Sequence, residues 1–175
     1  MDYSDELVRL REEFERSWNG YEFLRDNLIE ESPTSKLLHE EGNLTERYVR
    51  DKITEETIEA KRAAEGEGRQ RLIEEGSDVW YWTALSCIRN GIRYDELNPH
   101  KIIMEGYRKG VPDVLEAPIA NYPLGSKEGI SYSSRRTLDF LGMLCNMAEV
   151  DPIEIAQYDL QKMRQKPYLQ HLFAD

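Results

Sequence analysis

The chain has 175 residues, of which 39% are hydrophobic and 33% are charged, a size and composition typical of one compact domain or of a domain with an appendage. Its 34 acidic residues outnumber its 23 basic residues and give a net charge of −11, which argues against free nucleic acid as a partner. A bound metal ion would allow such a surface to attract phosphate.

The sequence predicts neither a membrane span nor a disulfide framework. No apolar run approaches the roughly 20 residues of a spanning helix, and the acidic N-terminus lacks the apolar region of a signal peptide. We therefore expect a soluble, cytoplasmic protein with no membrane partner. Cys87 and Cys145 lie far apart in apolar stretches, which predicts two buried, reduced thiols rather than a disulfide or a zinc site.

Apolar residues recur at helical spacing along most of the chain, beginning with Leu7, Leu10 and Phe14. The same period returns in five further stretches, which are 44–64, 69–91, 95–109, 134–148 and 152–165. Ser32-Pro33 and Asp151-Pro152 each place a capping side chain before a proline at the first helical position. Because alternating strand patterns are scarce, the predicted fold class is all-α.

Glycine and proline divide the chain into two helical parts. Five of these residues lie within 111–132 and predict a long connecting segment. We therefore expect a core over 1–110 and a C-terminal helical pair over 133–175. An aspartate followed by an apolar helical stretch occurs at Asp78 and again at Asp139, which leaves open that the C-terminal pair is a degenerate second half of the fold.

Two groups of charged residues carry the strongest chemical signal. The first group lies at offsets 0, +3, +4 and +7 along one stripe of a helix and consists of Lys52, Glu55, Glu56 and Glu59. Glu75 and Asp78 form an acidic pair on the next predicted helix, and a short link makes the two helices antiparallel neighbours. Facing carboxylates repel one another unless a cation lies between them, and hard oxygen ligands suit Mg²⁺ or Mn²⁺.

Composition offers a plainer interpretation of the same pattern. With 34 acidic residues among 175, such a spacing also arises by chance, as part of a solvated helix face. However, Glu75 and Asp78 stand at the start of an apolar run, Val79–Leu85. We therefore expect this acidic edge to border the core, which favours a binding site over a purely solvated face.

Four motifs in this region, taken together, are similar to those of a known enzyme family, and they are Ser32–Leu38, Lys52–Glu59, Ala63-Ala64 and Leu72–Tyr81. In order and spacing, residues 32–109 resemble the phosphoribosyl-ATP pyrophosphohydrolases and their relatives, the MazG-type and dimeric dUTPase-type all-α nucleotide pyrophosphohydrolases. The resemblance implies a four-helix-bundle-like core with a C-terminal helical extension, assembled as a homodimer or higher homo-oligomer. Thr54 replaces a glycine and Trp82 a histidine of the family pattern, so the sequence leaves open which nucleotide is the substrate.

The resemblance also implies roles for the acidic residues. The carboxylates that match the family's magnesium ligands are Glu56, Glu59, Glu75 and Asp78. Glu55 matches the remaining catalytic acid, which orients water or a further ion. The implied enzyme cleaves a nucleoside triphosphate or its derivative between the α and β phosphates, with Mg²⁺ or alternatively Mn²⁺ as cofactor, and leaves a monophosphate and pyrophosphate. The alternative is a catalytically inactive helical nucleotide-binding or assembly module.

Five residues are candidates for binding the nucleotide, each with a structural alternative. Lys101, Arg108 and Lys109 resemble the basic C-terminal helix of MazG-type enzymes, although such residues also occur as a solvated surface. Lys52 lies one turn before the acids and suits either a phosphate contact or a salt bridge with the glutamate four residues later. Trp82, one turn beyond the second acidic pair, suits either stacking on a nucleobase or packing in the core.

Overall fold

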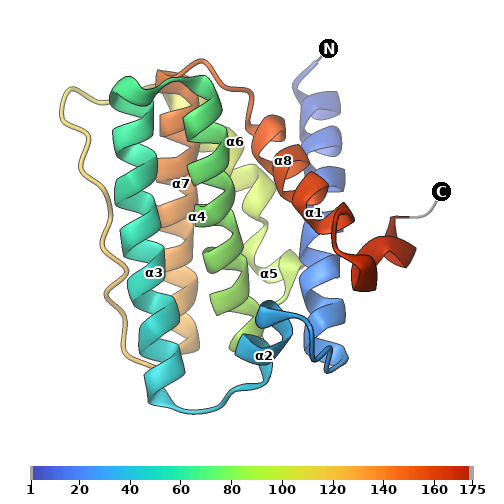
Figure 1. The fold of residues 1–175 in the computed structure, drawn as a ribbon. Helices are drawn as coiled ribbons and strands as arrows, with labels where there is room; N and C mark the ends of the chain where they lie inside the picture. Colours follow the sequence, from blue (N-terminus) through green and yellow to red (C-terminus); the bar gives the residue numbers. More distant parts are fainter. Residues whose placement is uncertain (1, 174–175) are drawn as a thin grey trace.

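The computed structural model describes residues 2–173 and contains eight α-helices and no strand in that range (Figure 1). The helices are α1 (Tyr3–Asp26), α2 (Pro33–His39), α3 (Asn43–Arg62), α4 (Arg69–Arg89), α5 (Tyr94–Leu97), α6 (Pro99–Lys109), α7 (Lys127–Met147) and α8 (Pro152–Arg164). A π-helical turn, η1 (Ala63–Glu67), follows α3, and a 3-10 turn, η2 (Pro167–Leu172), follows α8. The all-α fold class is thus confirmed. Within the described residues, none of these helices combines the length and the apolar character needed to cross a membrane.

Two helices begin where capping residues predicted. The Ser32 hydroxyl accepts a hydrogen bond from the backbone N–H of Ser35 at 3.1 Å at the start of α2. At the start of α8, the Asp151 carboxylate accepts a backbone hydrogen bond at 3.1 Å, and the Glu154 side chain accepts one from the Asp151 N–H at 3.1 Å. A cap of this kind stabilises a helix by about 1 kcal/mol, which explains why these starts are readable in the sequence.

Two helix boundaries differ from the prediction. α7 begins directly after Ser126, whose hydroxyl accepts a hydrogen bond from the Gly129 N–H at 3.1 Å, so the connecting segment ends six residues before the predicted position 132. Gly129 suggested a loop but lies in the first turn of the helix. The predicted helix over 95–109 is divided into α5 and α6, because Asn98 adopts the left-handed conformation with φ 51° and is followed by a proline.

The connecting segment explains the topology of the bundle. α3 and α4 are antiparallel neighbours, α7 lies behind them, and the segment runs back along α3, so that α6 and α7 point in the same direction (Figure 1). Two hydrogen bonds hold the segment to α3. The Arg50 guanidinium donates to the Tyr122 carbonyl at 2.9 Å, and the Ala120 N–H donates to the Thr54 hydroxyl at 2.9 Å. Neither Pro-rich composition nor length alone predicted this attachment.

α6 and α7 approach each other closely enough for their backbones to touch. A Cβ atom added at Gly106 would lie 2.1 Å from the carbonyl oxygen of Asp139, and one added at Gly142 would lie 2.1 Å from that of Ile103. Only glycine fits at such positions, because a backbone atom cannot move aside as a flexible side chain can.

The hydrophobic core is continuous from the N-terminal helices into α7 and α8. Trp80 of α4, Leu141 of α7 and Ile155 of α8 belong to one buried cluster, and none is more than 1% exposed. The described part of 133–175 therefore packs on the same core as residues of 1–110. The origin of this helical pair as a degenerate second half stays a prediction.

Candidate active site

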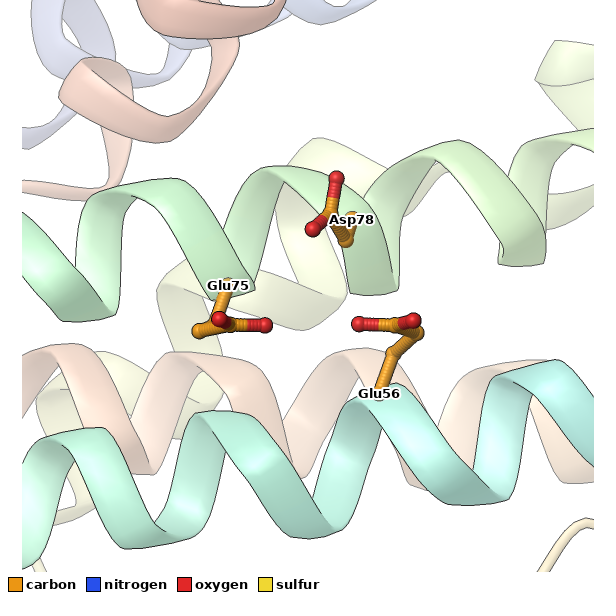
Figure 2. A group of neighbouring side chains, drawn as sticks. All are labelled: Glu56, Glu75 and Asp78. Atoms are coloured by element: carbon orange, nitrogen blue, oxygen red, sulfur yellow. The ribbon is translucent and has the colours of Figure 1, made fainter.

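Three of the four predicted metal ligands meet in the gap between α3 and α4. Glu56, Glu75 and Asp78 each offer a carboxylate oxygen, and these oxygens lie within 4.8 Å of one another. Figure 2 shows the Glu56 side chain reaching from α3 toward Glu75 and Asp78 on α4. The three-residue spacing of the α4 pair places both carboxylates on one helix face, as the sequence predicted. We call these three residues the carboxylate cluster.

Glu75 is the most buried member of the carboxylate cluster. Its exposed fraction is 4%. Its Oε1 pairs with the guanidinium of Arg71, one turn earlier, at 2.5 Å, whereas Oε2 is buried without a hydrogen-bond partner among the described residues. Leaving a buried acceptor unpaired costs about 1–3 kcal/mol. Oε2 is therefore an oxygen that the fold itself leaves unsatisfied and that a cation can bind.

Burial and mutual repulsion change the acidity of this cluster. Burial raises the pKa of Glu56 to about 7, and the charges of Asp78, Glu59, Glu75 and Glu55 add to the effect. Burial likewise raises the pKa of Glu75, against the opposing influence of Arg71 and together with the carboxylate of Glu59. These carboxylates thus favour a proton or a metal ion between them. A donor set of only carboxylate oxygens fits a hard divalent cation.

Glu59 and Glu55 lie at the edge of the carboxylate cluster. Glu59 is half-buried, and its charge contributes to the raised pKa of both Glu56 and Glu75. Glu55 has a side chain that is 53% exposed and pairs with Lys52 at 3.3 Å. Of the two alternatives for Lys52, the salt bridge therefore forms with Glu55 and not with Glu56, whose side chain turns toward α4. A contact of Lys52 with a phosphate stays a prediction. Glu55 and Glu59 both line a groove of about 600 Å³ between α3 and the connecting segment.

Trp82 packs rather than projecting into an open site. Its side chain is half-buried against the core, with ring centroids 5.8 Å from Tyr48 and 4.9 Å from Tyr81, both in edge-to-face orientation. Such aromatic pairs contribute about 0.5–1.5 kcal/mol beyond area burial. The packing alternative for Trp82 matches its position, and its stacking on a base stays a prediction.

The basic residues predicted on α6 have their partners on other helices. Lys109 Nζ lies 3.1 Å from each carboxylate oxygen of Asp139 on α7, and the Arg108 guanidinium lies 4.0 Å from the ring centroid of Tyr3 on α1. Lys101 is exposed. Because α6 packs on α7 and α1, the structure does not bring these three residues together with the carboxylate cluster. Their contact with a substrate stays a prediction.

Two cations that sequence reasoning missed do touch the cluster. Arg71 pairs with Glu75, and this contact could have been predicted because residues four apart lie on the same helix face. Lys162 of α8 pairs with Asp78 at 3.3 Å, although 84 residues separate the two in the chain. No local sequence pattern predicts a contact between residues so far apart in the chain. It depends on how α8 packs against α4.

Fold and site together define the class: an all-α protein whose paired antiparallel helices carry a carboxylate cluster able to hold a divalent cation. The model of the phosphoribosyl-ATP pyrophosphohydrolase family matches residues 24–100, which contain all the predicted acidic site residues. The resemblance noted in the sequence is thus confirmed for that stretch, and the match supports a pyrophosphohydrolase-type activity on nucleotides. α7 and α8 lie outside it. No curated protein and no solved structure matches the chain at a significant level.

Proposed function

We propose that this protein is a Mg²⁺-dependent nucleotide pyrophosphohydrolase that cleaves its substrate between the α and β phosphates. The observation that carries the proposal is the carboxylate cluster, one member of which, Glu75, has a buried Oε2 with no hydrogen-bond partner among the described residues. The family match over residues 24–100 supports the reaction class. The substrate would be phosphoribosyl-ATP or another nucleoside triphosphate, and the products a monophosphate and pyrophosphate.

The acidic residues of α3 and α4 would have two roles, cation binding and proton transfer. Glu56, Glu75 and Asp78, with Glu59 beside them, would hold the cation. A bound Mg²⁺ supplies positive charge that stabilises the phosphate oxygens and the leaving pyrophosphate. Glu55 would accept the proton of the attacking water, because it stands next to the cluster on α3 and its carboxylate remains open to solvent. The homo-oligomeric assembly expected from the resemblance stays a prediction.

Pyrophosphate release provides the direct test. The purified chain would be incubated with phosphoribosyl-ATP and with each common ribo- and deoxyribonucleoside triphosphate, in Mg²⁺, in Mn²⁺ and in EDTA. We expect release from at least one nucleotide only when the divalent cation is present. A folded wild-type protein that releases pyrophosphate from none of them would refute the proposal and favour the inactive binding or assembly module.

The variant Glu59→Gln tests the assignment of the acidic residues. Removing one charge beside the cluster weakens cation binding and transition-state stabilisation together, so we expect at least about a hundredfold lower rate. The circular dichroism spectrum should not change. Glu65→Gln is the matched control, because Glu65 is an exposed residue of η1 whose ion pair among the described residues is with Lys61 of α3. An unchanged rate in Glu59→Gln would contradict the role given to Glu59.

A further inference from the structure

A second cavity opens beside the carboxylate cluster, on the opposite side of α4 from the groove along α3. Its volume is about 290 Å³, close to the lower end of the range for small-molecule sites. Asp78 lies in its wall, so the cavity and the cluster share a residue. About half of the lining comes from α8 and η2, which lie outside the stretch that matches the family. We call this space the α8 cavity.

Two lysines offset the two aspartates, Asp78 and Asp159, in the lining of the α8 cavity. Lys162 and Lys166 both line it, four residues apart near the C-terminal end of α8. The Lys162 ammonium lies 3.3 Å from Asp78 Oδ1, and the two side chains are 38% and 42% exposed. Lys166 is exposed and has no carboxylate partner among the described ion pairs. An exposed pair such as Lys162–Asp78 contributes little to stability, so it can exchange partners at low cost.

The remaining wall of the α8 cavity is mainly aromatic and apolar, and it includes the Asp159 carboxylate, which accepts hydrogen bonds from Ser17 and Tyr21. Tyr81 lies in it with its hydroxyl 2.6 Å from that of Thr34, and its ring stands edge-to-face with Tyr21 at 5.5 Å. Tyr168 and Leu24 complete this side. Rings that are fixed by hydrogen bonds and packing present a preorganised apolar surface, which suits a flat heteroaromatic base.

We propose that the α8 cavity binds the nucleotide, with its base against the tyrosines and its phosphates on Lys162 and Lys166. The proposal rests on the proposed function, since the substrate there is a nucleotide cleaved at the carboxylate cluster. With a cation held by Asp78, Lys162 would lose its partner and would be available to a phosphate oxygen. Charge-assisted hydrogen bonds of this kind are the strong ones in proteins. The two lysines assigned to phosphate binding thus lie in α8 and two residues after its end, outside the matched stretch.

Calorimetric titration with nucleotides that cannot be cleaved tests the pocket without relying on activity. The probes are the α,β-methylene analogues of the four common nucleoside triphosphates, each with Mg²⁺. We expect Lys162→Met and Lys166→Met each to lower the affinity for the tightest-binding analogue about tenfold, because each variant loses one charge-assisted contact. Lys162→Arg should retain most of the affinity. Lys127→Met is the matched control, since Lys127 makes an equally long ion pair with Glu96 away from the cavity.

A second titration separates phosphate binding from a purely structural role of Lys162. With Mg²⁺ alone, Lys162→Met should bind the ion at least as tightly as the wild type, because Asp78 has lost its competing lysine. Wild-type affinity for the analogues in both methionine variants would overturn the proposal, as would a wild type that binds none of them. If the wild type nevertheless releases pyrophosphate, the proposed function stands and only the pocket is wrong. Lysine-dependent binding without any hydrolysis would support the pocket and refute the catalytic proposal.

Discussion

The repulsion within the carboxylate cluster should make Glu56→Gln more stable than the wild type when no divalent cation is present. Burial and four neighbouring carboxylates raise the pKa of Glu56 from 4.5 to about 7. A raised pKa means that folding opposes the ionised form. The stability that the protonated Glu56 provides is complete below pH 4.5 and is lost as the pH rises through about 7. Glutamine has the same shape but cannot ionise, so the variant escapes this loss.

The size of the effect follows from the same change in acidity. A carboxyl group whose pKa rises from 4.5 to about 7 loses about 3 kcal/mol of folding free energy when fully ionised. Solvent reaches part of the Glu56 side chain and screens its charge, which leaves about 1–2 kcal/mol. We therefore expect Glu56→Gln to gain that amount at pH 8 and nothing at pH 4.5.

Urea denaturation in EDTA, followed by circular dichroism at pH 4.5, 6 and 8, measures this difference directly. Adding Mg²⁺ at pH 8 should then reverse the order of stability, since the ion binds the intact cluster and stabilises the folded wild type by mass action. Glu65→Gln serves as the control and should follow the wild type at every pH, because its ion pair with Lys61 lies outside the cluster.

Two results would refute this reasoning. One is a Glu56→Gln variant that is less stable than the wild type at pH 8 in EDTA, which would mean that Glu56 makes a favourable contact rather than a repulsive one. The other is a difference that does not change with pH, which would mean that ionisation of Glu56 is not its cause.

Two further predictions concern packing. Gly142→Ala should lower the unfolding free energy by about 1–3 kcal/mol in urea denaturation, because the added Cβ would lie 2.1 Å from a backbone oxygen of α6; Gly66→Ala, with no neighbour within 4 Å, should leave it nearly unchanged. Cys87 and Cys145 are free and fully buried, as the sequence predicted, and burial raises the pKa of Cys87 to about 12 and that of Cys145 as well. A thiol reagent such as Ellman's should therefore react with neither cysteine in the native protein and with both in guanidinium; rapid native reaction would contradict their burial.

Helix starts marked by a capping side chain before a proline could be predicted well from the sequence. Ser32 and Asp151 mark the starts of α2 and α8 as expected. The prediction failed where two local signals compete. Gly129 suggested a loop, yet the cap at Ser126 and the burial of Ile130 make this segment the first turn of α7. Asn98 interrupts an apolar period that continues on both sides of it.

In the candidate site, too, contacts between residues close in the sequence could be predicted, and contacts between distant residues could not. Helical spacing predicted that Glu56, Glu75 and Asp78 would face one another, because each offset of three or four residues fixes a side chain on one face. Spacing does not specify which helix packs on the far side of α4. Lys162 therefore could not be predicted as the partner of Asp78, whereas the basic residues of α6, which lie nearer in the sequence, were predicted to bind the nucleotide.

A buried polar network explains why α8 places its lysine at the site. Asp159 is 1% exposed, and its carboxylate accepts hydrogen bonds from Ser17 at 2.5 Å and Tyr21 at 2.7 Å on α1, with Ser77 of α4 at 3.5 Å. A buried carboxylate needs all of these partners, so α8 has only one favourable register against α1 and α4. Lys162 lies three residues later, on the same helix face, and that register brings it to Asp78. Burial of Asp159 thus fixes the position of the lysine that pairs with Asp78 and to which we assign phosphate binding.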